Sequence, residues 1–180
     1  MNKDVRTLLA DISSNNINAL GELYDLLARS VFNYIYVITK NKQMAEDVTH
    51  DVFLQTYQKA SKIEKAPDPV AYIMVIARNH SYNVIKKESR ITTLEDSDIN
   101  DIESSLQYDR LLFEDAFNTL PASQRETVYL HLICGHTQKN IAAIQNTPLV
   151  TVKWRYRQAV SKLRDYFTQN EMEVNCNELI

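Results

Sequence analysis

Glycine is nearly absent from this chain of 180 residues, which holds only Gly21 and Gly135. Hairpin turns and phosphate-cradling loops need glycine, because their backbone angles are costly for other residues. The shortage therefore excludes a fold rich in β-hairpins and a phosphate-binding loop. Apolar residues recur instead at three- and four-residue spacing without sustained alternation, which predicts an all-α protein.

Cysteines and long apolar runs are also scarce. Cys134 and Cys176 belong to no CxxC pattern, so we expect a reduced core residue and a tail residue, with no disulfide frame or zinc site. No run approaches the roughly 20 apolar residues that span a bilayer, and acids interrupt residues 1–16, where a signal peptide needs an apolar core. These absences predict a cytoplasmic protein. No nucleophile–base pair, metal cluster or phosphate loop is apparent, so we expect neither catalytic activity nor a cofactor.

The formal net charge of −3 is unevenly distributed along the chain. Residues 1–90 and 121–180 each carry a net charge of +2, whereas residues 91–120 carry −7. Within the acidic block, residues 91–109 have six acids, no base and no clear periodic apolar face, which predicts a flexible linker. It could be a solvated spacer or could imitate nucleic acid in a positively charged channel of a partner.

This linker divides the chain into two expected domains. Residues 1–90 form the first small helical domain and residues 110–168 the second. Residues 169–180 form an acidic tail that we expect to be loose.

The second domain carries a helix-turn-helix pattern. Pro121 suits the first turn of a helix that would run to about Ile133, with Val128, Leu132 and Ile133 on one side. Gly135 follows as a C-cap.

A second, shorter helix comes next. Thr137 can cap it, and its inward residues are expected to be Ile141, Ala142 and Ile144. A tight turn at residues 145–147 leads to Pro148, which starts the last helix. A short turn between two helices, the second of them basic, is typical of the helix-turn-helix motif.

The segment from Asn146 to Arg164 carries five cations and no anion. At 100° per residue, one stripe of its helix is apolar and would pack inward: Val152, Tyr156, Ala159, Val160, Leu163 and Tyr166. The other face offers donors, cations and an apolar group, as a helix that reads DNA bases requires: Thr151, Trp154, Arg157, Gln158 and Ser161, flanked by Lys153 and Arg155. A solvated face or a partner-binding helix would show the same charge pattern, and a lone Trp is more often packed than exposed.

Residues 43–60 of the first domain predict another helix. Its apolar stripe comprises Val48, Val52, Tyr57 and Ala60, extended by Phe53 and Leu54. Its first turns are expected to hold an acidic cluster, favoured by the helix dipole: Glu46, Asp47 and Asp51. No His or Cys converges there, so we interpret the cluster as a dipole complement and a docking surface for a basic partner.

Pro67 and Pro69 mark a loop before residues 71–90, which begin apolar and become polar and basic. Aromatic rings are interleaved there with Asn and cations, a composition suited to single-stranded nucleic acid: Tyr72, Arg78, Asn79, His80, Tyr82, Asn83, Lys86 and Lys87. Taken alone, Tyr72 and Tyr82 are more often core or semi-buried residues.

Four segments together resemble bacterial sigma factors of the extracytoplasmic-function (ECF) group, in the sigma-70 family: "AEDVTHDVF", "AYIMVIARNHSYNVIKK", "LPASQRETVYL" and "TPLVTVKWRYRQAVSKLR". The resemblance covers residues 23–167 apart from the linker. It implies two helical domains, called region 2 and region 4, in a non-catalytic subunit that directs RNA polymerase to promoters. The implied partners are core RNA polymerase and promoter DNA, and many relatives also bind an anti-sigma factor.

The resemblance also implies a role for each segment. Asp47, Asp51 and Phe53 would dock on a coiled coil of the largest polymerase subunit. Residues 61–83 would melt and hold the −10 element, with the loop at residues 62–68 capturing a flipped base. The contacts expected at the −10 element are Lys62, Tyr72, Arg78, Asn79, Tyr82, Asn83, Lys86 and Lys87. The contacts expected at the −35 element are Thr151, Lys153, Trp154, Arg155, Arg157 and Gln158. The acidic linker would thread the RNA-exit path.

The chain departs from the family pattern at three places. Tyr72 stands where a Trp is common, a basic residue expected near Val75 is missing, and Val150 and Trp154 replace the usual small pair around Thr151. We therefore expect an unusual promoter preference and weak binding to naked DNA, since Lys and Arg contacts set sequence-independent affinity. The alternatives are a stand-alone helix-turn-helix regulator that binds duplex DNA without polymerase, and a helical adaptor whose basic helix binds protein.

Overall fold

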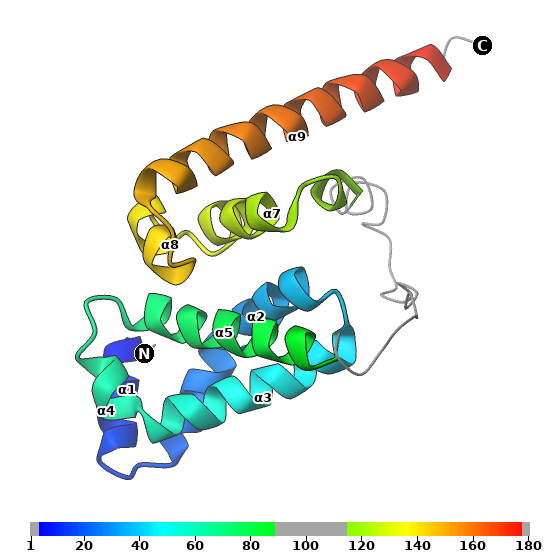
Figure 1. Ribbon diagram of the computed structural model, residues 1–180. Coiled ribbons are helices and arrows are strands. Elements are labelled where there is room, and N and C mark those ends of the chain that lie inside the picture. Colours follow the sequence, from blue (N-terminus) through cyan, green and yellow to red (C-terminus); the bar gives the residue numbers. More distant parts are fainter. Residues whose placement is uncertain (1–3, 89–114, 178–180) are drawn as a thin grey trace.

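The computed structural model describes residues 4–88 and 115–177, with side chains as far as Gln169. Within these ranges every regular element is helical and no strand occurs, which confirms the all-α prediction. Helices α1 to α5 precede the gap, and α7, η1, α8 and α9 follow it (Figure 1). None of the described helices is both long and apolar enough to cross a membrane.

The N-terminal part consists of α1 (Val5–Ser13), α2 (Asn18–Thr39), α3 (Lys42–Gln58), α4 (Ala60–Glu64) and α5 (Pro69–Glu88). Helices α2, α3 and α5 pack on one another, and α1 closes the end next to α4. The core between them includes fully buried side chains from every one of these helices: Leu9, Leu23, Tyr34, Ile35, Val52, Ile63 and Ile73. Burying each such apolar side chain contributes roughly 1.5–3 kcal/mol.

Helix α3 differs from the prediction in its first turn and in which of its side chains are buried. The Asn41 side chain accepts the N–H of Met44 at 2.9 Å, so the helix begins at Lys42 and its first turn holds no acid. The predicted dipole complement by the acidic cluster is therefore wrong, because the dipole acts mainly within the first turn. Tyr57 is 38% exposed and Leu54 58%, whereas Thr56 is buried and bonds to the carbonyl of Val52.

The predicted loop at residues 62–68 is partly helical, since Lys62 lies on α4. The remaining turn is held by Arg6, whose guanidinium donates to the backbone carbonyls of Glu64 and Ala66. Asp68 ends the turn by accepting the N–H of Ala71 at 2.9 Å, which fixes the first turn of α5.

The C-terminal part begins with helical residues 115–118 and continues with α7 (Ala122–Val128), η1 (Tyr129–Ile133), α8 (Gln138–Ile144) and α9 (Leu149–Asn177). The η1 segment is a π-helical turn, whose extra backbone shifts the angular positions of its own later residues away from those of an α-helix. Leu132 and Ile133 are consequently 53% and 56% exposed, and the prediction that they pack beside Val128 is wrong. Tyr129 and Leu130 are buried instead.

The predicted turns between these helices are confirmed. Gly135 has a φ of +71°, the left-handed conformation expected of a C-cap glycine. The Thr137 hydroxyl accepts the N–H of Asn140 at 3.2 Å and caps α8. Burial raises the pKa of the half-buried Cys134 thiol to about 11, as suits the reduced core residue expected there.

Helix α9 continues to Asn177, so the prediction of a loose tail is wrong for residues 169–177. The predicted linker, residues 91–109, lies outside the described residues.

The two parts of the protein pack against each other. Helix α8 lies on α5, and α7 lies on α2, so that buried residues of both parts form one continuous apolar cluster (Figure 1). The rings of Tyr34 and Tyr129 stack across this boundary with centroids 6.3 Å apart. The sequence predicted two domains on a tether but gave no sign of this contact.

Candidate nucleic-acid interface

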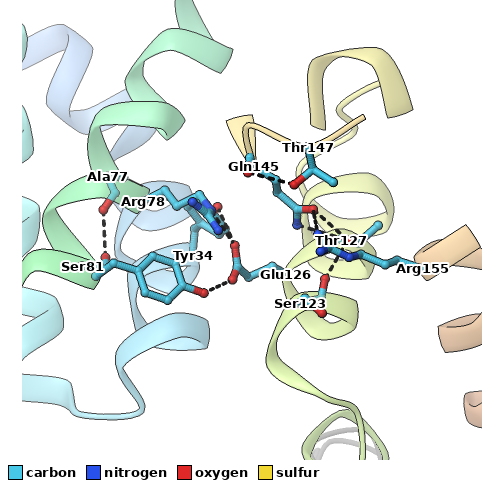
Figure 2. Close-up of polar contacts among 11 residues, drawn as sticks. Tyr34, Ala77, Arg78, Ser81, Ser123, Glu126, Thr127, Gln145, Thr147 and Arg155 are labelled. Carbon is cyan, nitrogen blue, oxygen red and sulfur yellow. Dashed lines mark hydrogen bonds and ion pairs between the residues drawn. The ribbon is translucent and has the colours of Figure 1, made fainter. Parts of the chain in front are cut away.

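The turn between α8 and α9 is fixed by Gln145, which is buried. Its side-chain N–H donates to the Thr127 hydroxyl at 3.1 Å, and its side-chain oxygen accepts from Arg155 at 3.1 Å (Figure 2). Thr127 in turn donates to the carbonyl of Ser123 on α7. One buried amide therefore ties α7, α8 and α9 together and sets the angle at which α9 leaves the turn.

Helix α9 buries the apolar stripe that the sequence predicts. Val152 and Ala159 are fully buried and Leu163 is 7% exposed, while Tyr156, Val160 and Tyr166 are partly buried. Tyr156 packs edge-on against His131, with ring centroids 4.7 Å apart. The opposite face is thereby held toward solvent.

Most of the residues predicted to read the −35 element lie on that exposed face. Lys153, Arg157 and Gln158 are exposed, Trp154 is 54% exposed, and Thr151 is half-exposed. Among the described residues, neither Lys153 nor Arg157 pairs with a carboxylate. We call Thr151, Lys153, Trp154, Arg157 and Gln158 the α9 face.

Arg155 lies apart from the α9 face. It is half-buried, and its guanidinium bonds to Gln145, so it stabilises the turn where the sequence predicted a cation at the flank of the DNA-binding face.

The residues predicted for the −10 element lie on α4 and α5, with differing exposure. Lys62, Asn79, Asn83, Lys86 and Lys87 are exposed, and Tyr72 is half-buried. Arg78 and Tyr82 lie along one edge of α5, where they meet the C-terminal part of the protein. We call Tyr72, Arg78, Asn79, Tyr82 and Asn83 the α5 face.

Glu126 of α7 occupies that edge. Its carboxylate accepts the Nε–H of Arg78 at 3.0 Å and the hydroxyl of Tyr34 at 3.4 Å (Figure 2). The same carboxylate accepts the hydroxyl of Tyr82. Glu126 is 2% exposed, and the Arg78 ion pair is a charge-assisted bond of the stronger class. The Arg78 guanidinium also lies 4.6 Å from the centre of the Tyr82 ring.

The protonation states in this cluster favour the same arrangement. Burial and the hydrogen bond to Glu126 raise the pKa of Tyr82 to about 12, and burial raises the pKa of Tyr34 well above its ordinary range. Burial alone would lower the pKa of Arg78, but the Glu126 carboxylate holds it above its ordinary value. Both phenols therefore remain donors and Arg78 remains a cation at neutral pH.

The residues predicted to dock on polymerase are divided between surface and core. Asp47 and Asp51 are exposed on α3. Phe53 is 4% exposed and packs on the ring of Tyr24, with centroids 4.7 Å apart, so it supports this surface from beneath. An open groove of about 280 Å³ runs beside the acids, between α2 and α3, and includes Tyr24, Phe32 and Glu46 in its lining.

Sequence reasoning missed Glu126 and Gln145, the two buried polar side chains on which this geometry depends. A charged residue on the inner side of an amphipathic helix was the available signal for Glu126, because such a side chain needs a buried partner. The sequence does not indicate which cation provides it.

Comparison with known families identifies the same two parts. The description "Sigma-70 region 2" matches residues 23–91 and "Sigma-70, region 4" matches residues 110–163. ECF RNA polymerase sigma factor SigK of Mycobacterium sp. (strain JLS) is 22% identical over 173 residues, which cover 90% of each chain. ECF RNA polymerase sigma factor SigL of Mycobacterium tuberculosis (strain ATCC 25618 / H37Rv) is 29% identical over 152 residues, covering 79% of this chain and 85% of SigL.

Solved structures share the fold. The sigma factor RpoE, in complex with the anti-sigma factor NepR from Bartonella quintana, superposes with a TM-score of 0.70 at 23% identity, covering 84% of this chain and 98% of RpoE. CnrH, in complex with the cytosolic domain of CnrY, gives a TM-score of 0.66 at 20% identity, covering 92% of this chain and 99% of CnrH. The chain therefore belongs to the sigma-70 family, in its extracytoplasmic-function group, and is a sigma factor that directs RNA polymerase to promoters.

Proposed function

We propose that this sigma factor divides promoter recognition between the α9 face, which reads duplex DNA at the −35 element, and the α5 face, which holds the melted −10 strand. The observation that carries this proposal is the α9 face itself: exposed cations and a half-exposed Trp on the second helix of a rigid helix-turn-helix. Binding alone performs this task, so no catalytic group is required.

The chemistry of the α9 face suits duplex DNA. Lys153 and Arg157 can neutralise phosphates or bond to guanine, Gln158 can pair with adenine, and Trp154 offers an apolar surface to a thymine methyl group. Arg155 supports them by fixing the turn through Gln145.

The chemistry of the α5 face suits a single strand. Tyr72 and Tyr82 can stack on unpaired bases while Asn79 and Asn83 bond to base edges. Extruding each base costs a few kcal/mol of stacking and pairing, which contacts of this kind offset.

Core RNA polymerase is the partner that brings both faces to a promoter. We assign its docking surface to Asp47 and Asp51, whose exposed carboxylates suit a basic partner. An anti-sigma factor is a second partner class, by analogy with the NepR complex of RpoE. We place the protein in the cytoplasm, where RNA polymerase acts.

Run-off transcription over genomic fragments tests the proposal. Core RNA polymerase with this protein should yield discrete transcripts that core polymerase alone does not, and gel shifts at physiological salt should show little binding of the free protein to the same fragments. Tight, specific binding by the lone protein, with no transcripts, would support the stand-alone regulator instead. The α9 face alone is compatible with either protein, so this pair of assays decides between them.

A further inference from the structure

We propose that Glu126 is an intramolecular latch: it holds the free protein in a closed conformation in which the two DNA-reading faces cannot engage a promoter together. The inference rests on the proposed function, because it takes Arg78 and Tyr82 to be groups that meet DNA. What it adds is that the Glu126 carboxylate occupies Arg78 and Tyr82 until the two parts of the protein separate.

The first argument is competition for donors. Arg78 gives its Nε–H to Glu126, and Tyr82 gives its only hydroxyl proton to the same carboxylate. A carboxylate bound to a guanidinium and a phenol reproduces the anionic oxygens that a DNA backbone would offer these groups. While Glu126 stays in place, these donors are unavailable to a promoter strand.

The second argument is distance. Helix α8 contacts both α5 and α9 (Figure 1), and because packed helix axes are about 8–10 Å apart, the two reading helices approach within about 20 Å where α8 bridges them. By the positions in their names, the −35 and −10 elements lie about 25 base pairs apart, which is about 85 Å of duplex at 3.4 Å per base pair. The closed arrangement therefore cannot span both elements.

The third argument is that the boundary has enough specific contacts to persist. Beyond the Glu126 cluster, the Asn140 amide donates to Asp68, and the Lys40 ammonium donates to Asn118 at 2.6 Å. The stacked rings of Tyr34 and Tyr129 add apolar contact beside Glu126. Of these contacts, only the Glu126 cluster uses residues of the α5 face, which is why we place the latch there.

Opening must leave neither Glu126 nor Arg78 buried without a partner, because an unpaired buried charge is strongly destabilising. Separation of the two parts exposes both groups to water. Removing Glu126 alone leaves Arg78 half-buried without its carboxylate partner in the closed form. The loss of Glu126 should therefore favour the open form, in which water solvates Arg78.

The test compares variants of the full-length free protein. Glu126→Ala removes the acceptor, Glu126→Gln keeps the shape without the charge, and Tyr34→Phe removes one donor that has no proposed DNA contact. Asp25→Asn, which removes an exposed carboxylate from α2, is the matched control for net charge. Thermal melts establish which variants are folded; if Glu126→Ala is not, Glu126→Gln and Tyr34→Phe carry the test.

Two measurements are made on each variant. Small-angle X-ray scattering gives the radius of gyration, and fluorescence anisotropy gives the affinity for a labelled single strand covering the −10 region of a promoter found by run-off transcription. We expect Glu126→Ala to increase both, with an affinity gain of about tenfold, since a hindered state lowers apparent affinity by its share of the population. Glu126→Gln and Tyr34→Phe should move both readouts less, in the same direction, and Asp25→Asn should move neither.

The outcomes separate the latch from the function on which it rests. A larger radius without an affinity gain supports the latch and removes the DNA role of Arg78 and Tyr82. An unchanged radius in all the Glu126 and Tyr34 variants overturns the latch, whether or not the affinity changes. Equal effects of Asp25→Asn and Glu126→Gln also overturn it, because net charge would then explain both.

Discussion

The α9 face and the α5 face resemble each other in composition but differ in what their cations contact. On α9, Lys153 and Arg157 are exposed and meet no carboxylate among the described residues. On α5, Arg78 bonds to a carboxylate that is 2% exposed. A charge pattern thus predicts where cations gather along a chain, but only the packing of the two parts determines which of them are available to DNA.

The largest expected effect is on transcription, when an exposed cation of the α9 face is removed. Lys153→Ala and Arg157→Ala should each lower −35-dependent run-off transcription roughly five- to 150-fold, because a good contact to a base contributes about 1–3 kcal/mol. Polymerase binding in a pull-down should be intact, since α3 is untouched. If neither variant affects transcription from a cognate promoter, the α9 face is assigned wrongly.

A second test separates packing from recognition on the same helix. Val152→Ala should lower the free energy of unfolding by about 2 kcal/mol, because it deletes fully buried methyl groups. Trp154→Ala should change it by less than about 0.5 kcal/mol, as for other exposed positions, yet reduce transcription from the same promoter. Chemical denaturation monitored by circular dichroism checks both variants. A large loss of stability in Trp154→Ala would mean that the ring packs rather than recognises DNA.

Local signals explain how much of this fold the sequence predicts. Gly135, Thr137 and Pro148 each act through the backbone within a few residues, so their turns could be placed correctly. The rotation of Leu132 and Ile133 to the surface could not, since the π-helical turn at η1 depends on how Tyr129 and Leu130 fit the core. Apolar spacing at ideal helical periodicity therefore places Leu132 and Ile133 on the side of Val128, which is the wrong face for both.

The contacts of Glu126 were beyond sequence reasoning for a related reason. Its partners Arg78 and Tyr82 are 48 and 44 positions away, on the other side of the predicted linker. Electrostatic patterns along one helix do not specify such pairs, and a two-domain interpretation removes them from consideration. The sequence therefore predicts DNA contacts on α5 with no indication that two of these residues, Arg78 and Tyr82, bond to Glu126.

A third prediction concerns a surface that the closed arrangement leaves exposed. Asp51→Arg should weaken capture of core polymerase by about tenfold, because like charges facing each other across an interface cost up to several kcal/mol. Asp51→Asn should show a smaller loss, and the loss from Asp51→Arg should be the same in the wild-type and Glu126→Gln backgrounds. Unchanged capture in a quantitative pull-down would remove the docking assignment, and a loss that depends on Glu126 would mean that docking requires prior opening.

The smallest expected effect is a pH dependence at the boundary between the two parts. His136, which precedes α8, is 7% exposed, and its Nε2 has no hydrogen-bond partner. Burial lowers the pKa of His136 below its ordinary value of 6.5, although the charge of Asp68, at the start of α5, partly opposes the shift. The nearby His131 ring bonds through Nδ1 to the backbone carbonyl of His136 at 2.8 Å.

The direction of the effect follows from proton linkage. The unfolded chain takes up a proton at His136 as the pH falls through about 6.5, whereas the folded protein keeps this imidazole neutral to a lower pH. Its contribution to stability is therefore complete above that pH and is lost as the pH falls below it. Differential scanning calorimetry should show the Tm of the wild-type protein falling with acidification more steeply than that of His136→Gln, which cannot take up this proton. His50→Gln removes an exposed imidazole from α3 and serves as the control; if His136→Gln keeps the wild-type slope, the pH dependence arises elsewhere.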